Sequence, residues 1–122
     1  MLGELIQRHH ARCWLLNTGW TGGAYGTGQR MPIKATRALL HAALGGDLEK
    51  APMTVHPVFG LRMPQACAGV DSTLLNPRAT WADKAAYDTA ARDLAARFED
   101  NFERFRPFVR DEVQAAAIRA AA

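Results

Sequence analysis

Residues 13–44 read CWLLNTGWTGGAYGTGQRMPIKATRALLHAAL, and this stretch decides the expected fold. It opens with an apolar run at 13–16 that does not alternate with polar residues, a pattern typical of a strand buried on both faces of a sheet. Five of the chain's ten glycines follow between Gly19 and Gly28. An apolar pattern with helical spacing starts at Pro32 or Ile33. The order strand, glycine turn, helix predicts an α/β unit.

The first of two main helices is expected to run from Pro32 or Ile33 to Leu44. Proline suits the first helical position because its missing N–H has no intrahelical partner there. Gly45 and Gly46 are natural stop signals. The apolar face of this helix is expected to consist of Ile33, Thr36, Leu40, Ala43 and Leu44.

The second main helix is expected to begin at a cap on Thr80, with Asp83 three residues later as in a variant capping box. Pro107 ends it. Its apolar stripe, at steps of three and four, is Tyr87, Ala91, Leu94, Phe98, Phe102 and Phe105. This pattern favours a helix packed on a core.

The remaining elements are short. Residues 2–10 suit a short helix, and residues 53–64, interrupted by Pro57 and Gly60, suit short strands around a turn or bulge. The fold class is therefore α/β in the sense of a mixed α+β unit. A central strand at 13–16 with so few neighbours indicates a piece of a larger sheet.

Composition narrows the function classes. A chain of 122 residues fits one domain. The net charge is +3 and no block of like charges occurs, so nucleic acid is not an expected partner. No apolar run approaches the roughly 18 residues of a transmembrane helix, so no membrane is expected either. Cys13 and Cys67 are expected to be free thiols.

The glycine-rich stretch does not match the two best-known phosphate-binding patterns. Gly23 and Gly28 have the spacing of a Walker A loop, but Gln29 and Arg30 stand where that loop needs lysine and a hydroxyl. Met31 stands where a dinucleotide fingerprint after Gly26 and Gly28 needs its third glycine. Two interpretations stay open on the residues alone. The stretch is a flexible strand-to-helix turn, or it is a turn that contacts a ligand beside Arg30.

Other chemistry is not indicated. No two of the four histidines have the i, i+4 spacing of a helical zinc site, so no metal ligand is predicted. Ser72 is the only serine, and no histidine lies near it in sequence. The residues alone therefore nominate no catalytic group.

Four stretches in this order resemble one family. They are WLLNTGWTGG at 14–23, GTGQRMPIKATRALLHAAL at 26–44, FGLRMPQACAGVD at 59–71 and LLNPRATWADKAAYD at 74–88. They are similar to the C-terminal part of ATP-dependent phosphoenolpyruvate carboxykinase. The resemblance implies that residues 1–122 are a C-terminal segment of its mononucleotide-binding domain, about the last quarter of a family member. It covers about 1–105 and leaves the tail 106–122 unassigned.

The resemblance implies an activity and its setting. The family converts oxaloacetate and ATP to phosphoenolpyruvate, ADP and carbon dioxide in cytoplasmic gluconeogenesis, using Mg²⁺ with the nucleotide and a second divalent ion, often Mn²⁺. Its phosphate loop, metal ligands and substrate-binding arginines lie upstream of the matched region. Catalytic and metal-binding residues are therefore not expected in this chain, and oxaloacetate would reach the enzyme only through the upstream region. The segment is expected to be inactive alone.

The resemblance also implies binding residues. In the family, three positions line the adenosine side of ATP. The first is the arginine that follows GTG and one further residue. The second is the residue directly after that arginine, and the third is the threonine of the following helix. These positions fall on Arg30, Met31 and Thr36, with Gly26 and Gly28 as the supporting loop. Two alternatives stay open. The chain is a non-catalytic module that self-associates through the apolar strand at 14–16, or it binds a nucleotide weakly by itself.

Overall fold

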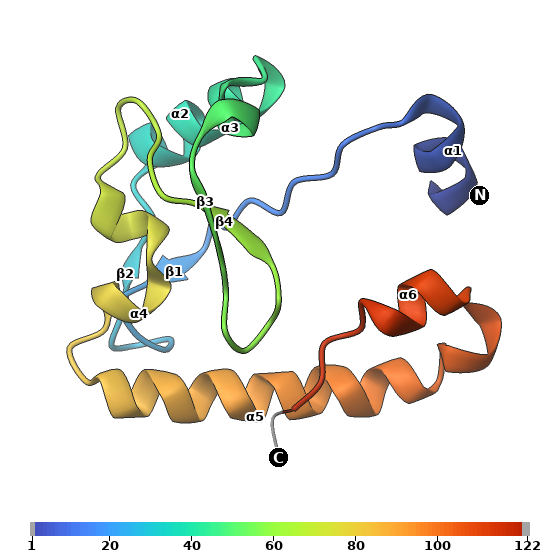
Figure 1. Cartoon of the computed structure of the whole chain (residues 1–122). Coiled ribbons are helices and arrows are strands. Elements are labelled where there is room, and N and C mark those ends of the chain that lie inside the picture. Colours follow the sequence, from blue (N-terminus) through green and yellow to red (C-terminus); the bar gives the residue numbers. More distant parts are fainter. Residues whose placement is uncertain (1, 121–122) are drawn as a thin grey trace.

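The computed structural model describes residues 2–120, which form a mixed α+β arrangement (Figure 1). The predicted mixed fold class is thereby confirmed. In chain order the elements are α1 (Leu2–His9), β1 (Trp20–Thr21), β2 (Gln29–Arg30), α2 (Ile33–Leu44), α3 (Asp47–Lys50), β3 (Met53–Val55), β4 (Arg62–Pro64), the 3-10 helix η1 (Ser72–Leu75), α4 (Pro77–Thr80), α5 (Lys84–Glu103), the 3-10 helix η2 (Arg106–Phe108) and α6 (Asp111–Ala115).

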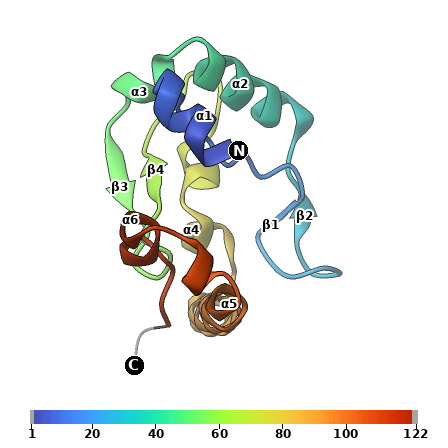
Figure 2. The same cartoon turned by 90° about the vertical axis from the view of Figure 1, so that its right-hand side faces the viewer.

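The described strands form two separate antiparallel hairpins. In the first, Trp20 of β1 lies opposite Arg30 of β2, and the glycine loop connects the two strands. In the second, Met53 of β3 lies opposite Pro64 of β4. Figure 2 shows the hairpins on either side of η1 and α4, with α2 and α3 at one end and α5 at the other. The short strands predicted within 53–64 are confirmed.

Helix α2 has the predicted bounds but a different buried face. It begins at Ile33, ends at Leu44 and is followed by Gly46 in the left-handed region, with φ of 79°. Its buried residues are Ala35 and Leu39, whereas Ile33 and Leu44 are 70% and 79% exposed. The predicted face was therefore wrong. The row with the small Ala35 packs inward, and the row of larger side chains stays open to solvent.

Helix α5 begins later than predicted. Asp83 caps it, because its carboxylate Oδ1 accepts hydrogen bonds from the backbone N–H groups of Ala85 at 2.8 Å and Ala86 at 3.0 Å. Thr80 instead ends α4, and the extended backbone of Trp81 (ψ of 140°) separates the two helices. The predicted Thr80 cap was wrong for this reason. Only Ala91 and Ala95 of α5 are buried.

The predicted strand at 13–16 is absent from the described chain. Residues 11–18 form no regular element, and Leu15 is 87% exposed. A strand exists only through its backbone pairing, and no other described segment pairs with this one. The apolar composition was read correctly, but its expected neighbours are not within residues 2–120.

The tail folds back along α5 instead of extending away (Figures 1 and 2). Gln114 of α6 donates from Nε2 to the backbone oxygens of Arg106 and Val109, both at 3.3 Å. The backbone N–H of Ala120 donates to Glu99 Oε2 at 3.0 Å. The tail, left unassigned by the sequence, thus docks on the last turns of α5.

The core is small for a chain of this size. Five apolar residues of the described chain are buried: Ala35, Leu39, Leu48, Ala91 and Ala95. The accessible surface is 9198 Å² at a mass of 13.4 kDa. A compact monomer of this mass exposes about 6500 Å². The surface is therefore larger than that of a compact monomer, and it includes many large apolar side chains.

Within residues 2–120, no helix has the length and apolarity to span a membrane.

Candidate functional site

The glycine loop between β1 and β2 is closed by its own backbone. The N–H groups of Thr27 and Gly28 both donate to the carbonyl oxygen of Ala24, at 3.0 and 2.9 Å. These two donors are therefore satisfied within the loop and are not directed at an external phosphate. The loop is thus a tight turn closed by its own backbone, and Gln29 and Arg30 follow it where a Walker loop needs lysine and a hydroxyl.

Gly28 and Gly26 are required for different reasons. An added Cβ at Gly28 would lie 2.6 Å from the backbone oxygen of Gly23 and 2.7 Å from that of Thr21. Gly26 has φ of 90°, in the left-handed region, with open space around it. The first glycine permits a close backbone approach and the second permits a backbone conformation that L side chains avoid. Both glycines therefore permit this turn, and their role as the supporting loop of a nucleotide site stays a prediction.

The three predicted nucleotide residues lie where β2 passes into α2. Arg30 is exposed, and no hydrogen bond or ion pair engages its guanidinium within the described part of the chain. Met31 is half-buried, and its N–H donates to the Gly19 oxygen at 2.8 Å, which fixes the strand end. Thr36 is half-buried in the first turn of α2. The three residues thus lie on one short stretch with an unengaged cation, and their contact with a nucleotide remains a prediction.

Thr80 anchors the glycine loop, a role that sequence reasoning missed. Its hydroxyl accepts a hydrogen bond from the N–H of Gly22 at 3.2 Å and donates to the oxygen of Pro77 at 2.7 Å. The Thr21 hydroxyl lies 3.4 Å from the hydroxyl oxygen of Thr80. The bond joins α4 to a loop 58 residues earlier. The sequence singled out Thr80 only as a helix cap, and nothing in it indicated a contact with the glycine loop.

Thr80→Val is expected to loosen the glycine loop. Valine has nearly the shape of threonine but cannot accept the Gly22 bond, so a half-buried donor is left without its partner at a cost of about 1–2 kcal/mol. Amide hydrogen exchange should therefore accelerate at Gly22. Thr27→Val, at an exposed position of the same loop, is the matched control. Equal exchange at Gly22 in both variants would contradict the anchoring role.

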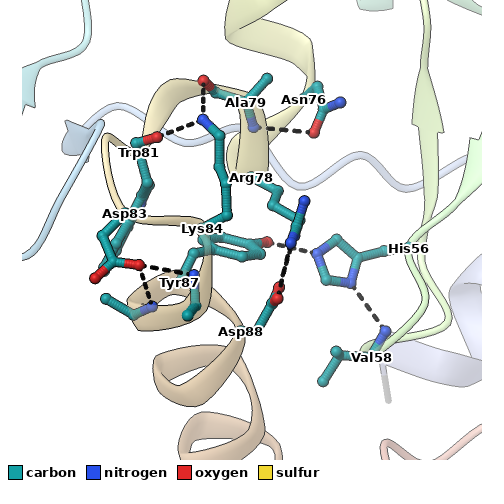
Figure 3. Close-up of polar contacts among 12 residues, drawn as sticks. His56, Val58, Asn76, Arg78, Ala79, Trp81, Asp83, Lys84, Tyr87 and Asp88 are labelled. Atoms are coloured by element: carbon teal, nitrogen blue, oxygen red, sulfur yellow. Dashed lines mark hydrogen bonds and ion pairs between the residues drawn. The ribbon is translucent and has the colours of Figure 1, made fainter.

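A second polar cluster joins the β3–β4 turn to α5 (Figure 3). His56 is only 6% exposed. Its Nδ1 accepts from the N–H groups of Val58 and Phe59, both at 3.2 Å, and its Nε2 lies 2.6 Å from the Tyr87 hydroxyl. Because Nδ1 accepts two bonds, the proton of the neutral ring is on Nε2, which donates to Tyr87. Burial lowers the pKa of His56 and raises the pKa of Tyr87.

Arg78 and Asp88 complete this cluster. Arg78 Nε lies 2.8 Å from Asp88 Oδ1, and the guanidinium reaches Oδ2 at 3.0 Å (Figure 3). This bidentate pair lowers the pKa of Asp88 and raises the pKa of Arg78. Lys84 Nζ donates to the backbone oxygens of Ala79, at 2.9 Å, and Trp81.

The cluster borders a cavity of about 520 Å³, but it offers no free acid or base. Its charged groups are paired, and no buried side-chain nitrogen or oxygen among residues 2–120 lacks a hydrogen-bond partner. Within those residues, no group of three or more His, Cys, Asp or Glu side chains is placed to hold a metal ion. The bonds of the cluster connect the β3–β4 turn to α5, and α4 to α5.

Comparison with known proteins gives a consistent result. The family model described as phosphoenolpyruvate carboxykinase matches residues 1–73. The phosphoenolpyruvate carboxykinase (ATP) of Rhizobium rhizogenes (strain K84) is 60% identical over 124 residues, covering 100% of this chain and 23% of the relative. That of Ruegeria sp. (strain TM1040) is 58% identical over 118 residues, covering 97% of this chain and 22% of the relative. The chain thus spans less than a quarter of the length of these curated relatives.

Proposed function

Because the chain belongs to the phosphoenolpyruvate carboxykinase family, we propose that it forms the adenosine-side wall of an ATP site. The enzyme would convert oxaloacetate and ATP to phosphoenolpyruvate, ADP and carbon dioxide, in cytoplasmic gluconeogenesis. The observation that carries the proposal is the family match, whose span of 1–73 includes the whole stretch from the glycine loop to α2.

The chemistry of the three residues suits an adenosine. The Arg30 guanidinium is unengaged, and its plane can stack on a purine or bond its edge. Thr36 can exchange hydrogen bonds with a ribose hydroxyl, because a hydroxyl both donates and accepts. Met31 offers a polarisable apolar contact to the ring.

The groups that bind the phosphates of the nucleotide are assigned to residues outside this chain. Phosphoryl transfer depends on cations that neutralise the charge on the phosphates. Gln29 and Arg30 follow Gly28 where a lysine and a hydroxyl would be needed, and the loop donors Thr27 and Gly28 are already bonded to Ala24. We assign the phosphates, Mg²⁺, Mn²⁺ and oxaloacetate to the part of the relatives that this chain does not span. The purified chain is accordingly expected to form no phosphoenolpyruvate.

Titration calorimetry with the purified chain tests the proposed wall. Adenosine and ATP are expected to bind with similar affinity, whereas inorganic triphosphate should not bind. Arg30→Ala should weaken binding about 5- to 10-fold, the effect of one lost cation–π or stacking contact. Thr36→Val should weaken it about 5-fold through one lost hydrogen bond.

The matched control is Arg62→Ala, which removes the same charge from an exposed position on β4. It should leave the affinity unchanged. Equal losses of affinity in Arg30→Ala and Arg62→Ala would mean that net charge, and not a contact of Arg30, causes the effect. Triphosphate binding as tight as that of ATP would move the site to the phosphate end and contradict the assignment.

A further inference from the structure

The hydroxyl group of Thr80 uses its whole hydrogen-bonding capacity. A hydroxyl has one donor and two acceptor positions. Thr80 donates to the Pro77 oxygen at 2.7 Å. Because its own proton is engaged there, it accepts from the Gly22 N–H at 3.2 Å and from the Thr21 hydroxyl at 3.4 Å. One half-buried side chain of α4 thus holds both the backbone and a side chain of the β1–β2 hairpin.

The β1–β2 hairpin depends on this attachment. Each strand has two residues, and an isolated two-stranded hairpin is only marginally stable in water. Among residues 2–120, every hydrogen bond that joins 20–30 to a segment outside 17–31 ends on the Thr80 hydroxyl. The two backbones also approach closely, since a Cβ added at Gly22 would lie 3.2 Å from the Thr80 carbonyl oxygen. Thr80 is therefore the hydrogen-bonding anchor of this hairpin.

The strand register places Arg30 on the other face of the hairpin. Thr21 lies opposite Gln29, and the next pair is Trp20 with Arg30. Directly opposed residues of an antiparallel pair share a face, and successive residues point to opposite faces. Because the Thr21 hydroxyl contacts Thr80, that face is turned toward α4, and the exposed Arg30 belongs to the opposite face. Thr80 can therefore act on Arg30 only through the hairpin backbone.

Helix α4 is itself held on α5 by two cations. Lys84 Nζ of α5 donates to the Ala79 oxygen of α4 at 2.9 Å (Figure 3). Arg78 of α4 pairs with Asp88 of α5 through two bonds, at 2.8 and 3.0 Å. Several bonds across one short contact restrict the motion of α4 relative to α5. The Thr80 hydroxyl therefore connects the hairpin to a helix pair whose own arrangement is fixed.

We propose that Thr80 is a positioning residue of the nucleotide site. Its hydroxyl holds the hairpin backbone on α4 at Gly22, and the same hairpin carries Arg30. The hairpin leads directly to Met31, whose N–H closes it at the Gly19 oxygen (2.8 Å). In this role Thr80 does not touch the nucleotide but fixes the strand that presents the binding side chains. The inference rests on the proposed adenosine wall and adds to it a residue from a different helix.

Calorimetric titration of the purified chain with adenosine tests the positioning role. Thr80→Val keeps the shape of the side chain but loses the hydroxyl, so the loosened hairpin is competent to bind for a smaller fraction of the time. Its affinity should fall about 5-fold, the factor that one net hydrogen bond contributes. Thr80→Ser keeps the hydroxyl and should restore the wild-type affinity. Thr89→Val makes the same exchange at an exposed position of α5 and is the matched control.

Gly22→Ala tests the same contact from the loop side. Its Cβ would meet the Thr80 carbonyl oxygen, and its φ of 77° is one that L side chains rarely adopt. It should weaken adenosine binding at least as much as Thr80→Val. In the double variant the two losses should be less than additive, because residues in direct contact are energetically coupled. Full additivity would mean that the two residues act separately, and it would overturn the inference.

Amide hydrogen exchange at Met31 distinguishes positioning from a local effect at Gly22. The Met31 amide should exchange faster in Thr80→Val, but not in Thr80→Ser or Thr89→Val, because only a coupled hairpin transmits the change to its far end. Equal Met31 exchange, or equal adenosine affinity, in Thr80→Val and Thr89→Val would overturn the inference. If the wild type bound no adenosine while Thr80→Val still accelerated Met31 exchange, the proposed wall would be wrong, and the coupling of Thr80 to the strand that carries Arg30 would stand.

Discussion

Gly28→Ala is expected to open the hairpin of β1 and β2 and to lower its local stability by about 2–4 kcal/mol, the range of a backbone-level clash. The added Cβ would lie 2.6 Å from the Gly23 oxygen and 2.7 Å from the Thr21 oxygen. Both atoms belong to the backbone, so no side-chain rotation relieves the contact. Thr21 pairs with Gln29 in the hairpin, so its displacement also breaks the ladder.

Amide hydrogen exchange measures this effect directly. The N–H of Met31, bonded to the Gly19 oxygen at 2.8 Å, closes the hairpin and should lose its protection in Gly28→Ala. Adenosine binding should fall with it, because Arg30 and Met31 are positioned by the same strand.

Two further glycines give a graded control. Gly26→Ala meets no atom within 4 Å but must adopt φ near 90°, so it should cost about 1–2 kcal/mol of backbone strain. Gly3→Ala meets no atom within 4 Å and has no such φ, so it should not reduce stability. If the Met31 amide exchanged no faster in Gly28→Ala than in Gly3→Ala, the result would contradict the close backbone approach at Gly28.

Sequence signals were reliable where the deciding interaction is local. The bounds of α2 follow from Pro32 and from the glycines after Leu44, which act within one turn. The start of α5 was harder, because Thr80 and Asp83 both have capping side chains. Asp83 is the cap because the backbone of Trp81 is extended, which is a property of the connection and not of the cap residues.

Signals failed where the deciding interaction comes from a distant segment. Helical spacing correctly marked α2 as amphipathic but could not tell that Ala35 packs inward while Ile33 faces solvent. The stretch at 13–16 has strand composition, yet pairing needs a neighbour that residues 2–120 do not contain. In each case the local pattern states a preference and the packing partner decides the outcome.

The residues of the candidate site also fall into those set by local sequence and those set by contacts with distant segments. Arg30, Met31 and Thr36 are within seven residues of one another, so a family resemblance could nominate them together, and their contact with ATP remains a prediction. Thr80 and His56 act through contacts with residues 58 and 31 positions away, at Gly22 and Tyr87. Neither residue type nor spacing indicates such contacts in a single sequence.

Acidification is expected to destabilise the chain through His56. Burial lowers its folded-state pKa below the ordinary value of 6.5. The unfolded chain therefore takes up a proton first as the pH falls, and stability rises with pH wherever the unfolded state binds more protons. The His56 contribution is complete above pH 6.5 and is lost as the pH falls from there through the lowered folded pKa, by up to about 1.4 kcal/mol per pH unit.

The titration of Asp88 does not overlap with the pH range in which His56 titrates. The Arg78 guanidinium lowers the pKa of Asp88 below its ordinary 3.8, so its contribution is lost only at more acidic pH. Tyr87, whose pKa is raised, stays neutral throughout. Urea denaturation at several points between pH 5 and pH 8 therefore isolates the histidine when the wild type is compared with a His56 variant.

His56→Leu and His56→Asn distinguish the effect of losing the hydrogen-bond acceptor from the effect of losing the group that titrates. Leucine leaves the N–H groups of Val58 and Phe59 and the Tyr87 hydroxyl without their partner, so the free energy of unfolding should fall by about 2–4 kcal/mol at pH 8. Asparagine can accept from the N–H groups two and three residues ahead, as in an Asx turn, and should recover about half of that loss. Neither side chain titrates between pH 5 and 8, so both variants should show a flatter pH dependence than the wild type. An unchanged slope in His56→Asn would assign the acid sensitivity to another group.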